Sequence, residues 1–233
     1  MSRRAWGVVL LTATVPGTVA LAAAGCGAEQ TAASSAAAGA AAMGPALLSP
    51  REVPAGFYPA DPQRAFRGIR PADPDCARLL RLADAVAVRG TRGAPHGHAA
   101  FFRAEPPATL VQHVYRLPKG RAAALLADAR AAAAGCPVIT MEVGDDREGR
   151  LYRARLRPPG GAGEAVAVRY AGKGRRQAGL DVVVARVGDD LVTVAAPGEF
   201  ARGGAETIEA AEQGAVRKLR AARDKIGEVR AEE

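Results

Sequence analysis

Apolar and polar residues alternate along several short stretches of the chain, which is the spacing of a half-buried β-strand. Turn-forming residues separate these stretches, as at Gly188-Asp189-Asp190. The short connections predict that neighbouring strands pair as antiparallel hairpins. The expected strands lie at residues 98–103, 109–117, 138–143, 150–157, 164–171, 180–187 and 191–196.

Apolar residues that recur every three or four positions predict helices, and residues 205–229 carry the clearest amphipathic stripe. Ile208, Leu219 and Val229 lie on this stripe, but most of its other members are alanine. An alanine-rich stripe favours packing on the sheet, and a helix on a membrane surface is the alternative. A helical turn capped by Ser49 is also expected. The predicted helices span 74–86, 120–135 and 205–229, and the turn spans 47–53. Together these elements predict an α+β fold, with an antiparallel β-sheet flanked by helices.

The N-terminal part of the chain has the layout of an export signal. Two arginines precede an apolar run, which Pro16 and Gly17 interrupt before it reaches the length of a membrane span. Residues 21–26 resemble a bacterial lipobox, in which the cysteine, here Cys26, is lipidated and becomes the new N-terminus. Ala23 departs from that pattern, where a larger aliphatic residue is usual. A plain secretory signal or a retained anchor is the alternative.

Composition divides the chain into three expected parts. The 233 residues are 48% hydrophobic but only 4% aromatic, which suits one domain of modest size and an unfolded segment. We expect a lipoprotein signal peptide at 1–25, a flexible Ala/Gly/Ser tether at 26–45 and the folded α+β domain at 46–230. Removal of the signal peptide, with Arg3 and Arg4, would lower the net charge from +8 to +6, which still favours weak, salt-sensitive attraction to anionic lipids or wall polymers.

Residues that carry chemistry are sparse in the predicted domain. No serine follows Ser49, and this absence excludes a Ser-His-Asp hydrolase there. His96 and His98 are half of a metal site at most, because no glutamate or cysteine at ligand spacing completes the set. His113 is expected within a strand. No catalytic residue, no metal and no cofactor is therefore predicted.

Cys76 and Cys136 remain once Cys26 is assigned to lipid. In an oxidising compartment such a pair in a small domain predicts a disulfide, and a two-thiol metal site lacks nearby histidines. The bridge would close a loop of about 60 residues and stabilise the fold by about 4 kcal/mol.

Arg153, Arg155 and Arg157 alternate along the predicted strand 150–157 and would therefore share one face of it. This basic face is expected either to contact an anionic lipid or polymer or to be an ordinary solvated surface. Nucleic acid is not an expected partner, because no aromatic ladder accompanies the arginines.

Several short motifs together resemble a known family. They are LLSPREVPAGF at 47–57, DPDC at 73–76, VQHV at 111–114 and the helix that closes on Cys136. These motifs resemble the sensor-type lipoproteins of actinobacteria, which are similar to the extracellular domain of PknH-type serine/threonine kinases. The resemblance implies an α+β domain with a ligand cleft and disulfide bracing. The kinase sensor domain is described with two disulfides, whereas this chain can form only one.

The sequence thus predicts a lipid-anchored, extracytoplasmic ligand-binding or sensor-like domain without catalytic activity. Its expected partners are the cell membrane, through the N-terminal lipid (palmitate among its acyl chains), and a small apolar or lipid ligand. A groove between the sheet and its helices would bind that ligand. The aromatic residues expected to line it are Phe101, Tyr115, Tyr152 and Tyr170. The alternative is a structural or wall-associated interaction protein that binds an anionic cell-wall polymer or lipid through the basic strand face.

Overall fold

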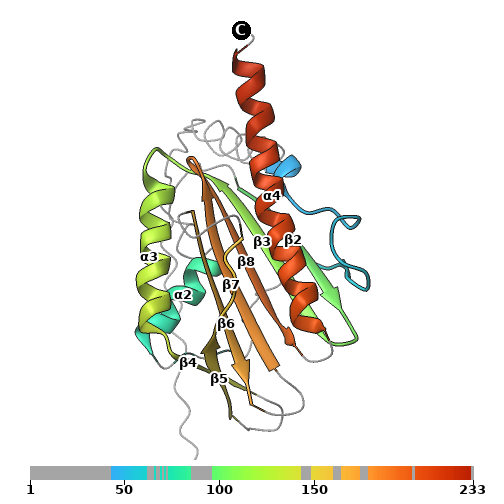
Figure 1. The fold of residues 1–233 in the computed structure, drawn as a ribbon, viewed down its shortest axis with the longest axis vertical. Helices are drawn as coiled ribbons and strands as arrows, with labels where there is room; N and C mark the ends of the chain where they lie inside the picture. Colours follow the sequence, from blue (N-terminus) through green and yellow to red (C-terminus); the bar gives the residue numbers. More distant parts are fainter. Residues whose placement is uncertain are drawn as a thin grey trace, which may run out of the picture.

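Eight strands form one antiparallel sheet in the residues that the computed structural model describes (Figure 1). The predicted α+β class, with helices flanking an antiparallel sheet, is confirmed. The described residues are 43–61, 66, 69, 71, 73–84, 96–142, 148–159, 164–173, 178–200 and 203–231. The predicted signal peptide, Cys26 and most of the predicted tether lie outside them.

The sheet follows the chain in two runs that meet at its centre. Its spatial order is β1-β2-β3-β8-β7-β6-β5-β4, so the C-terminal strand β8 inserts between β3 and β7. All neighbouring pairs are antiparallel, as the short predicted connections require. In chain order the strands are β1 (Tyr58–Pro59), β2 (His96–Arg103), β3 (Ala108–Arg116), β4 (Val138–Glu142), β5 (Glu148–Ala154), β6 (Ala165–Gly172), β7 (Ala178–Val187) and β8 (Asp190–Glu199).

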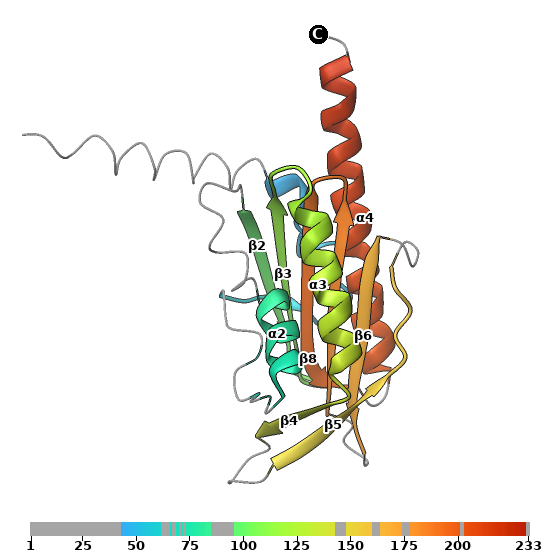
Figure 2. The ribbon, with the colours of Figure 1, turned by 90° about the vertical axis from the view of Figure 1, so that its left-hand side faces the viewer.

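Helices cover both faces of this sheet (Figures 1 and 2). One face packs against α2 (Pro74–Ala83) and α3 (Arg121–Gly135), and the other packs against α4 (Gly204–Ala231) and the 3₁₀ turn η1 (Gly44–Ala46). Central strands are therefore buried on both sides. In β7, Val182 and Val184 belong to the α2/α3 core, while Val183 between them belongs to the α4 core.

The predicted stripe on the last helix packs on the sheet. Ile208, Ala211, Ala215 and Leu219 are all buried in the α4 core, which confirms packing over a membrane-surface position for this part of the helix. The C-terminal part of α4 projects beyond the end of the sheet (Figure 2). Within the described residues, no helix combines the length and the apolar composition needed to cross a membrane.

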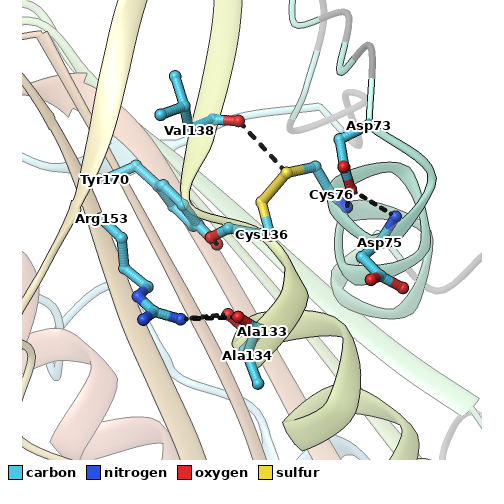
Figure 3. Close-up of a disulfide and its surroundings, with 9 residues drawn as sticks. All are labelled: Asp73, Asp75, Cys76, Ala133, Ala134, Cys136, Val138, Arg153 and Tyr170. Carbon is cyan, nitrogen blue, oxygen red and sulfur yellow. Dashed lines mark hydrogen bonds between the residues drawn. A yellow bond between two sulfur atoms is a disulfide. The ribbon is translucent and has the colours of Figure 1, made fainter.

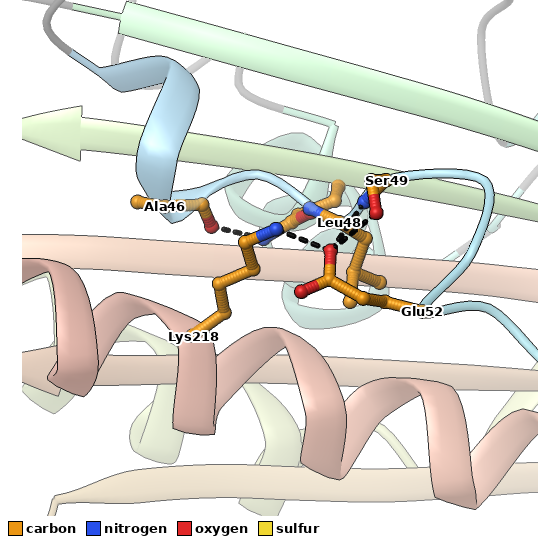
Figure 4. Close-up of polar contacts among 6 residues, drawn as sticks. Ala46, Leu48, Ser49, Glu52 and Lys218 are labelled. Carbon is orange, nitrogen blue, oxygen red and sulfur yellow. Dashed lines mark hydrogen bonds and ion pairs between the residues drawn. The ribbon is translucent and has the colours of Figure 1, made fainter.

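The predicted helical turn at 47–53 is present only as a single hydrogen-bonded turn from Ser49 to Glu52. The Glu52 amide donates to the Ser49 carbonyl (2.9 Å), and the Ser49 amide and hydroxyl both donate to the Glu52 carboxylate (2.8 and 2.6 Å) (Figure 4). The 3₁₀ turn η1 precedes it. Pro54 disfavours the helical conformation at the residue before it, so a helix cannot extend here.

Three polar contacts, made by two side chains of the domain, fix this N-terminal segment to the rest of it. Glu52 pairs with Lys218 of α4 (Figure 4). The fully buried Gln112 of β3 accepts from the Leu48 amide (2.8 Å) and donates to the Ala46 carbonyl (3.1 Å). The chain therefore joins the domain on its α4 side.

Candidate functional site

The two cysteines of the domain form the predicted disulfide (Figure 3). Cys76 lies in the first turn of α2, and Cys136 directly follows α3; both are fully buried. Asp73 caps α2 by accepting the Asp75 and Cys76 amides at 2.8 and 3.2 Å. The Tyr170 hydroxyl donates to the Cys136 carbonyl at 3.0 Å. This region braces the two helices against the sheet.

The predicted basic face does not exist as one surface, because β5 ends at Ala154 instead of continuing to residue 157. Arg153 lies opposite Tyr170 and donates to the carbonyls of Ala133 and Ala134 (2.8 and 3.2 Å), at the C-terminal end of α3 (Figure 3). A cation at this end of a helix is favourable. Arg153 therefore faces the α2/α3 side and stabilises the end of α3.

Beyond Ala154 the chain leaves the sheet, and Pro158 and Pro159, which have no amide hydrogen, could not continue the strand ladder. Leu156 anchors this segment in the same hydrophobic cluster as α4. Arg155 and Arg157, on either side of Leu156, are exposed at a cleft between the segment and α4. We call it the basic cleft. Its volume is about 1010 Å³, and it is lined by Arg155, Leu156, Arg157, Pro158, Pro159, Glu209, Gln213, Val216, Arg217 and Arg220.

Positive charge dominates the basic cleft. Four arginines line it against the single carboxylate of Glu209, which accepts a long hydrogen bond (3.4 Å) from Gln213. Among the described residues, Arg155, Arg157 and Arg217 form no ion pair. Guanidinium groups offer paired donors that match the oxygens of phosphate, sulfate or carboxylate. The cleft can therefore hold an anion between its two walls.

A group of buried charges lies next to the cleft, between α4 and the sheet. Arg169 of β6 donates to both oxygens of Asp181 of β7 (2.8 and 2.5 Å) and to the Ala205 carbonyl (3.3 Å). Glu212 of α4 is 1% exposed, and its Oε1 has no hydrogen-bond partner among the described residues. We call Asp181 and Glu212 the buried acidic pair.

Burial governs the protonation of this pair. It raises the pKa of Glu212 well above its usual range, and the charge of Asp181 adds to the effect. Burial also raises the pKa of Asp181, to about 6, although the Arg169 hydrogen bonds oppose the change. Asp181 accepts both hydrogen bonds from the Arg169 guanidinium and Glu212 accepts none of them, so the negative charge is better stabilised on Asp181 than on Glu212.

The four aromatic residues predicted to line a ligand groove do not share one surface. Phe101 is buried in the α4 core, whereas Tyr115 and Tyr170 are buried in the α2/α3 core. Tyr152 is 37% exposed, with the Lys173 ammonium 4.7 Å from its ring centre. Ligand binding by these residues stays a prediction.

The three histidines meet on the β2–β3 hairpin, which their sequence positions did not reveal. His98 pairs in register with His113, and His96 Nε2 lies 3.1 Å from His113 Nδ1. Tyr115 stacks on His96 with ring centres 4.6 Å apart. Across the described part of the chain, no three histidine, cysteine or acidic side chains form a group that could hold a metal ion.

Sequence reasoning missed Arg217 and Arg220 as site residues because a basic second half of a helix is also what the helix dipole favours. It also missed the buried acidic pair. Asp181 interrupts the apolar run of β7, and Glu212 falls between Ala211 and Ala215 on the predicted apolar stripe. A charge inside an apolar pattern was the available signal.

No family model and no curated protein matches this chain. Its structure is similar to the crystal structure of the extracellular domain of PknH from Mycobacterium tuberculosis, with a TM-score of 0.58 and 17% identity over 77% of this chain and 93% of that one. A protein from Mycobacterium smegmatis, the ortholog of Rv0999, aligns with a TM-score of 0.34 and 16% identity over 78% of this chain and 96% of that one. The first similarity confirms the predicted PknH-like fold.

Proposed function

We propose that this protein is a non-catalytic, extracytoplasmic domain that binds an anionic ligand in the basic cleft. The observation that carries the proposal is the excess of arginine there, with three guanidinium groups that have no carboxylate partner among the described residues. Unpaired arginines that face each other across a cleft repel one another, and an anion between them relieves that repulsion. The likeness of the fold to an extracellular domain supports the extracytoplasmic location.

We further propose that Cys26 carries lipid and holds the domain at the outer face of the cytoplasmic membrane, with residues 26–45 as its tether. The lipobox-like residues 21–26 support this. Mass spectrometry of the N-terminal peptide from the native host's membrane fraction tests it. A diacylglyceryl modification on Cys26 is the expected result, and an unmodified Cys26 contradicts lipid anchoring.

Isothermal titration calorimetry on the full chain in non-ionic detergent tests the binding proposal. The probe is inositol hexasulfate, a compact polyanion whose charge does not change near neutral pH. We expect binding that weakens by about tenfold or more in Arg217→Ala/Arg220→Ala, since each charge-assisted contact contributes about 1.5–3 kcal/mol. The matched control is Arg51→Ala/Arg121→Ala, which removes the same charge from two exposed sites outside the cleft. No binding, or equal weakening in both double variants, contradicts the proposal.

The cleft also supports a second candidate function, in which the protein binds an anionic cell-wall polymer. Arg155 and Arg157 support it, whereas Arg153 is engaged with α3. Dextran sulfate compared with inositol hexasulfate separates the two candidates. A polymer-binding protein binds the long chain much more tightly per sulfate group, because the chain continues beyond the cleft. A domain for a compact ligand shows no such gain.

A further inference from the structure

The basic cleft and the buried acidic pair share one helix. Glu209 of α4 lines the cleft, and Glu212, three residues later, is turned into the interface with the sheet. Residues three apart on a helix are neighbours on its surface. A charge that enters the cleft therefore comes close to the buried acidic pair.

The charges around Glu212 disfavour its ionisation while Asp181 is also ionised. The charged groups that face it are Asp181 from β7, Arg169 from β6 and Glu209 from α4 itself. One guanidinium thus stands among three carboxyl groups. Its hydrogen bonds go to Asp181 and to the Ala205 carbonyl, so they are not directed to Glu212.

Glu212 therefore responds to the charge beside it. Burial holds its pKa above the usual range, and the negative charges of Asp181 and Glu209 raise it further. An anion in the cleft acts in the same direction as these carboxylates. It increases the fraction of Glu212, and of Asp181, that holds a proton.

We propose that binding of an anion in the basic cleft is coupled to uptake of a proton by the buried acidic pair, so that the domain holds its ligand more tightly as the pH falls. This inference rests on the proposed function, because it concerns regulation of the same cleft. Linkage is reciprocal: if the anion favours the protonated pair, protonation favours the anion to the same extent. The affinity changes by at most about tenfold per pH unit for each proton taken up.

Other groups do not produce this pH dependence. The histidines belong to β2 and β3. Thr193 of β8 lies opposite His113 in the sheet, so the two side chains share one face, and Thr193 donates to the Ala83 carbonyl at the end of α2. The histidines thus lie on the α2/α3 face, across the sheet from the cleft. The probe, inositol hexasulfate, has no proton to gain near neutral pH.

Calorimetry on the full chain at about pH 6 and about pH 8, in two buffers of different ionisation enthalpy, measures the affinity and the protons taken up together. We expect binding to be about threefold to tenfold tighter at the lower pH, with net proton uptake. Glu212→Gln has nearly the same shape and does not titrate, so it should bind with little pH dependence. The matched control is Glu206→Gln, an exposed position on α4 outside the cleft, which should keep the pH dependence of the parent chain.

Asp181→Asn is a second variant that tests the same cluster. It frees Arg169 to pair with Glu212, which should then ionise and lose the coupling. Equal affinity at both pH values in the parent chain, or an unchanged pH dependence in Glu212→Gln, overturns the inference while the proposed function stands. Absence of binding at both pH values overturns the proposed function itself.

Discussion

The two faces of the sheet are built differently. The α2/α3 face is covered by a large apolar cluster and closed by a disulfide at one end of both helices. The α4 face is also largely apolar, but it buries Gln112, Asp181 and Glu212 and borders the basic cleft. The two faces of the sheet thus differ in how many polar and charged side chains they bury.

This difference separates stability from the candidate function. Buried polar and charged groups cost free energy unless their hydrogen bonds are satisfied, and Glu212 is only partly satisfied. Buried polar groups that lower stability in this way are expected at functional sites rather than in parts of the fold that only provide stability. The α2/α3 face therefore acts as the brace, and the α4 face is where we place ligand binding and its regulation.

The largest expected effect is on the bracing face. Replacing both cysteines in Cys76→Ala/Cys136→Ala should lower the free energy of unfolding by about 4 kcal/mol, because the unfolded chain regains the freedom of a loop of 60 residues. Urea denaturation followed by circular dichroism measures it. Binding of inositol hexasulfate below the transition should be unchanged. A loss below about 1 kcal/mol contradicts the bracing role.

On the other face, Glu212→Gln should stabilise the domain, most strongly at high pH. The folded state keeps the Glu212 proton to a higher pH than the unfolded chain, whose ordinary value is 4.5. Stability of the parent chain therefore falls as the pH rises above that value, and the variant lacks this contribution. We expect a gain of about 1–3 kcal/mol at about pH 8 and a much smaller gain at about pH 5. Urea denaturation across pH checks this; a destabilised variant at high pH contradicts it.

Arg153 and Arg155 offer a direct comparison between the faces. Arg153→Ala should destabilise the domain by about 1 kcal/mol, because it removes the donors to the last carbonyls of α3. Arg155→Ala should leave stability nearly unchanged but weaken anion binding. The same denaturation and calorimetric titrations measure both variants. Weaker anion binding in Arg153→Ala together with lower stability in Arg155→Ala would falsify the assignment of these arginines to opposite faces.

The smallest expected effect concerns the contact between the N-terminal segment and α4. Lys218→Ala should lower stability by about 0.5 kcal/mol, since Glu52 is well exposed. Lys218, with Ser49, lowers the pKa of Glu52 to about 2. The contribution is therefore present above the ordinary value of 4.5 and is lost as the pH falls toward 2. Thermal melting at neutral and acid pH measures the difference, and a loss that grows at acid pH contradicts this account.

Local patterns sufficed to predict most of the fold. Alternation and the turn residues between the apolar stretches sufficed to place the strands, although the central strands β3, β7 and β8 are buried on both faces. The paired cysteines indicated the bridge between α2 and α3. Arg153 and Arg157 were assigned to one face because alternation was assumed to continue past Ala154. Leu156 packs on the α4 side, as alternation requires, but Arg155 and Arg157 line the cleft on that same side because the strand ends at Ala154.

The candidate site depended on contacts between distant segments. Arg155 and Arg217 lie on opposite walls of one cleft, yet neither residue carries a local signature that relates it to the other. Asp181 and Glu212 were visible as charges within apolar runs, but only the pairing of β7 with α4 shows that they share one buried environment. The sequence therefore identifies these residues but does not show which of them lie close together in the fold.

The most direct test of the basic cleft is amide NMR of the full chain during titration with inositol hexasulfate. We predict chemical-shift changes at residues 155–157 and 209–220, with α2 and α3 unaffected. Changes confined to α2, α3 or the β2–β3 hairpin, or no changes at all, would contradict the assignment of ligand binding to the α4 face.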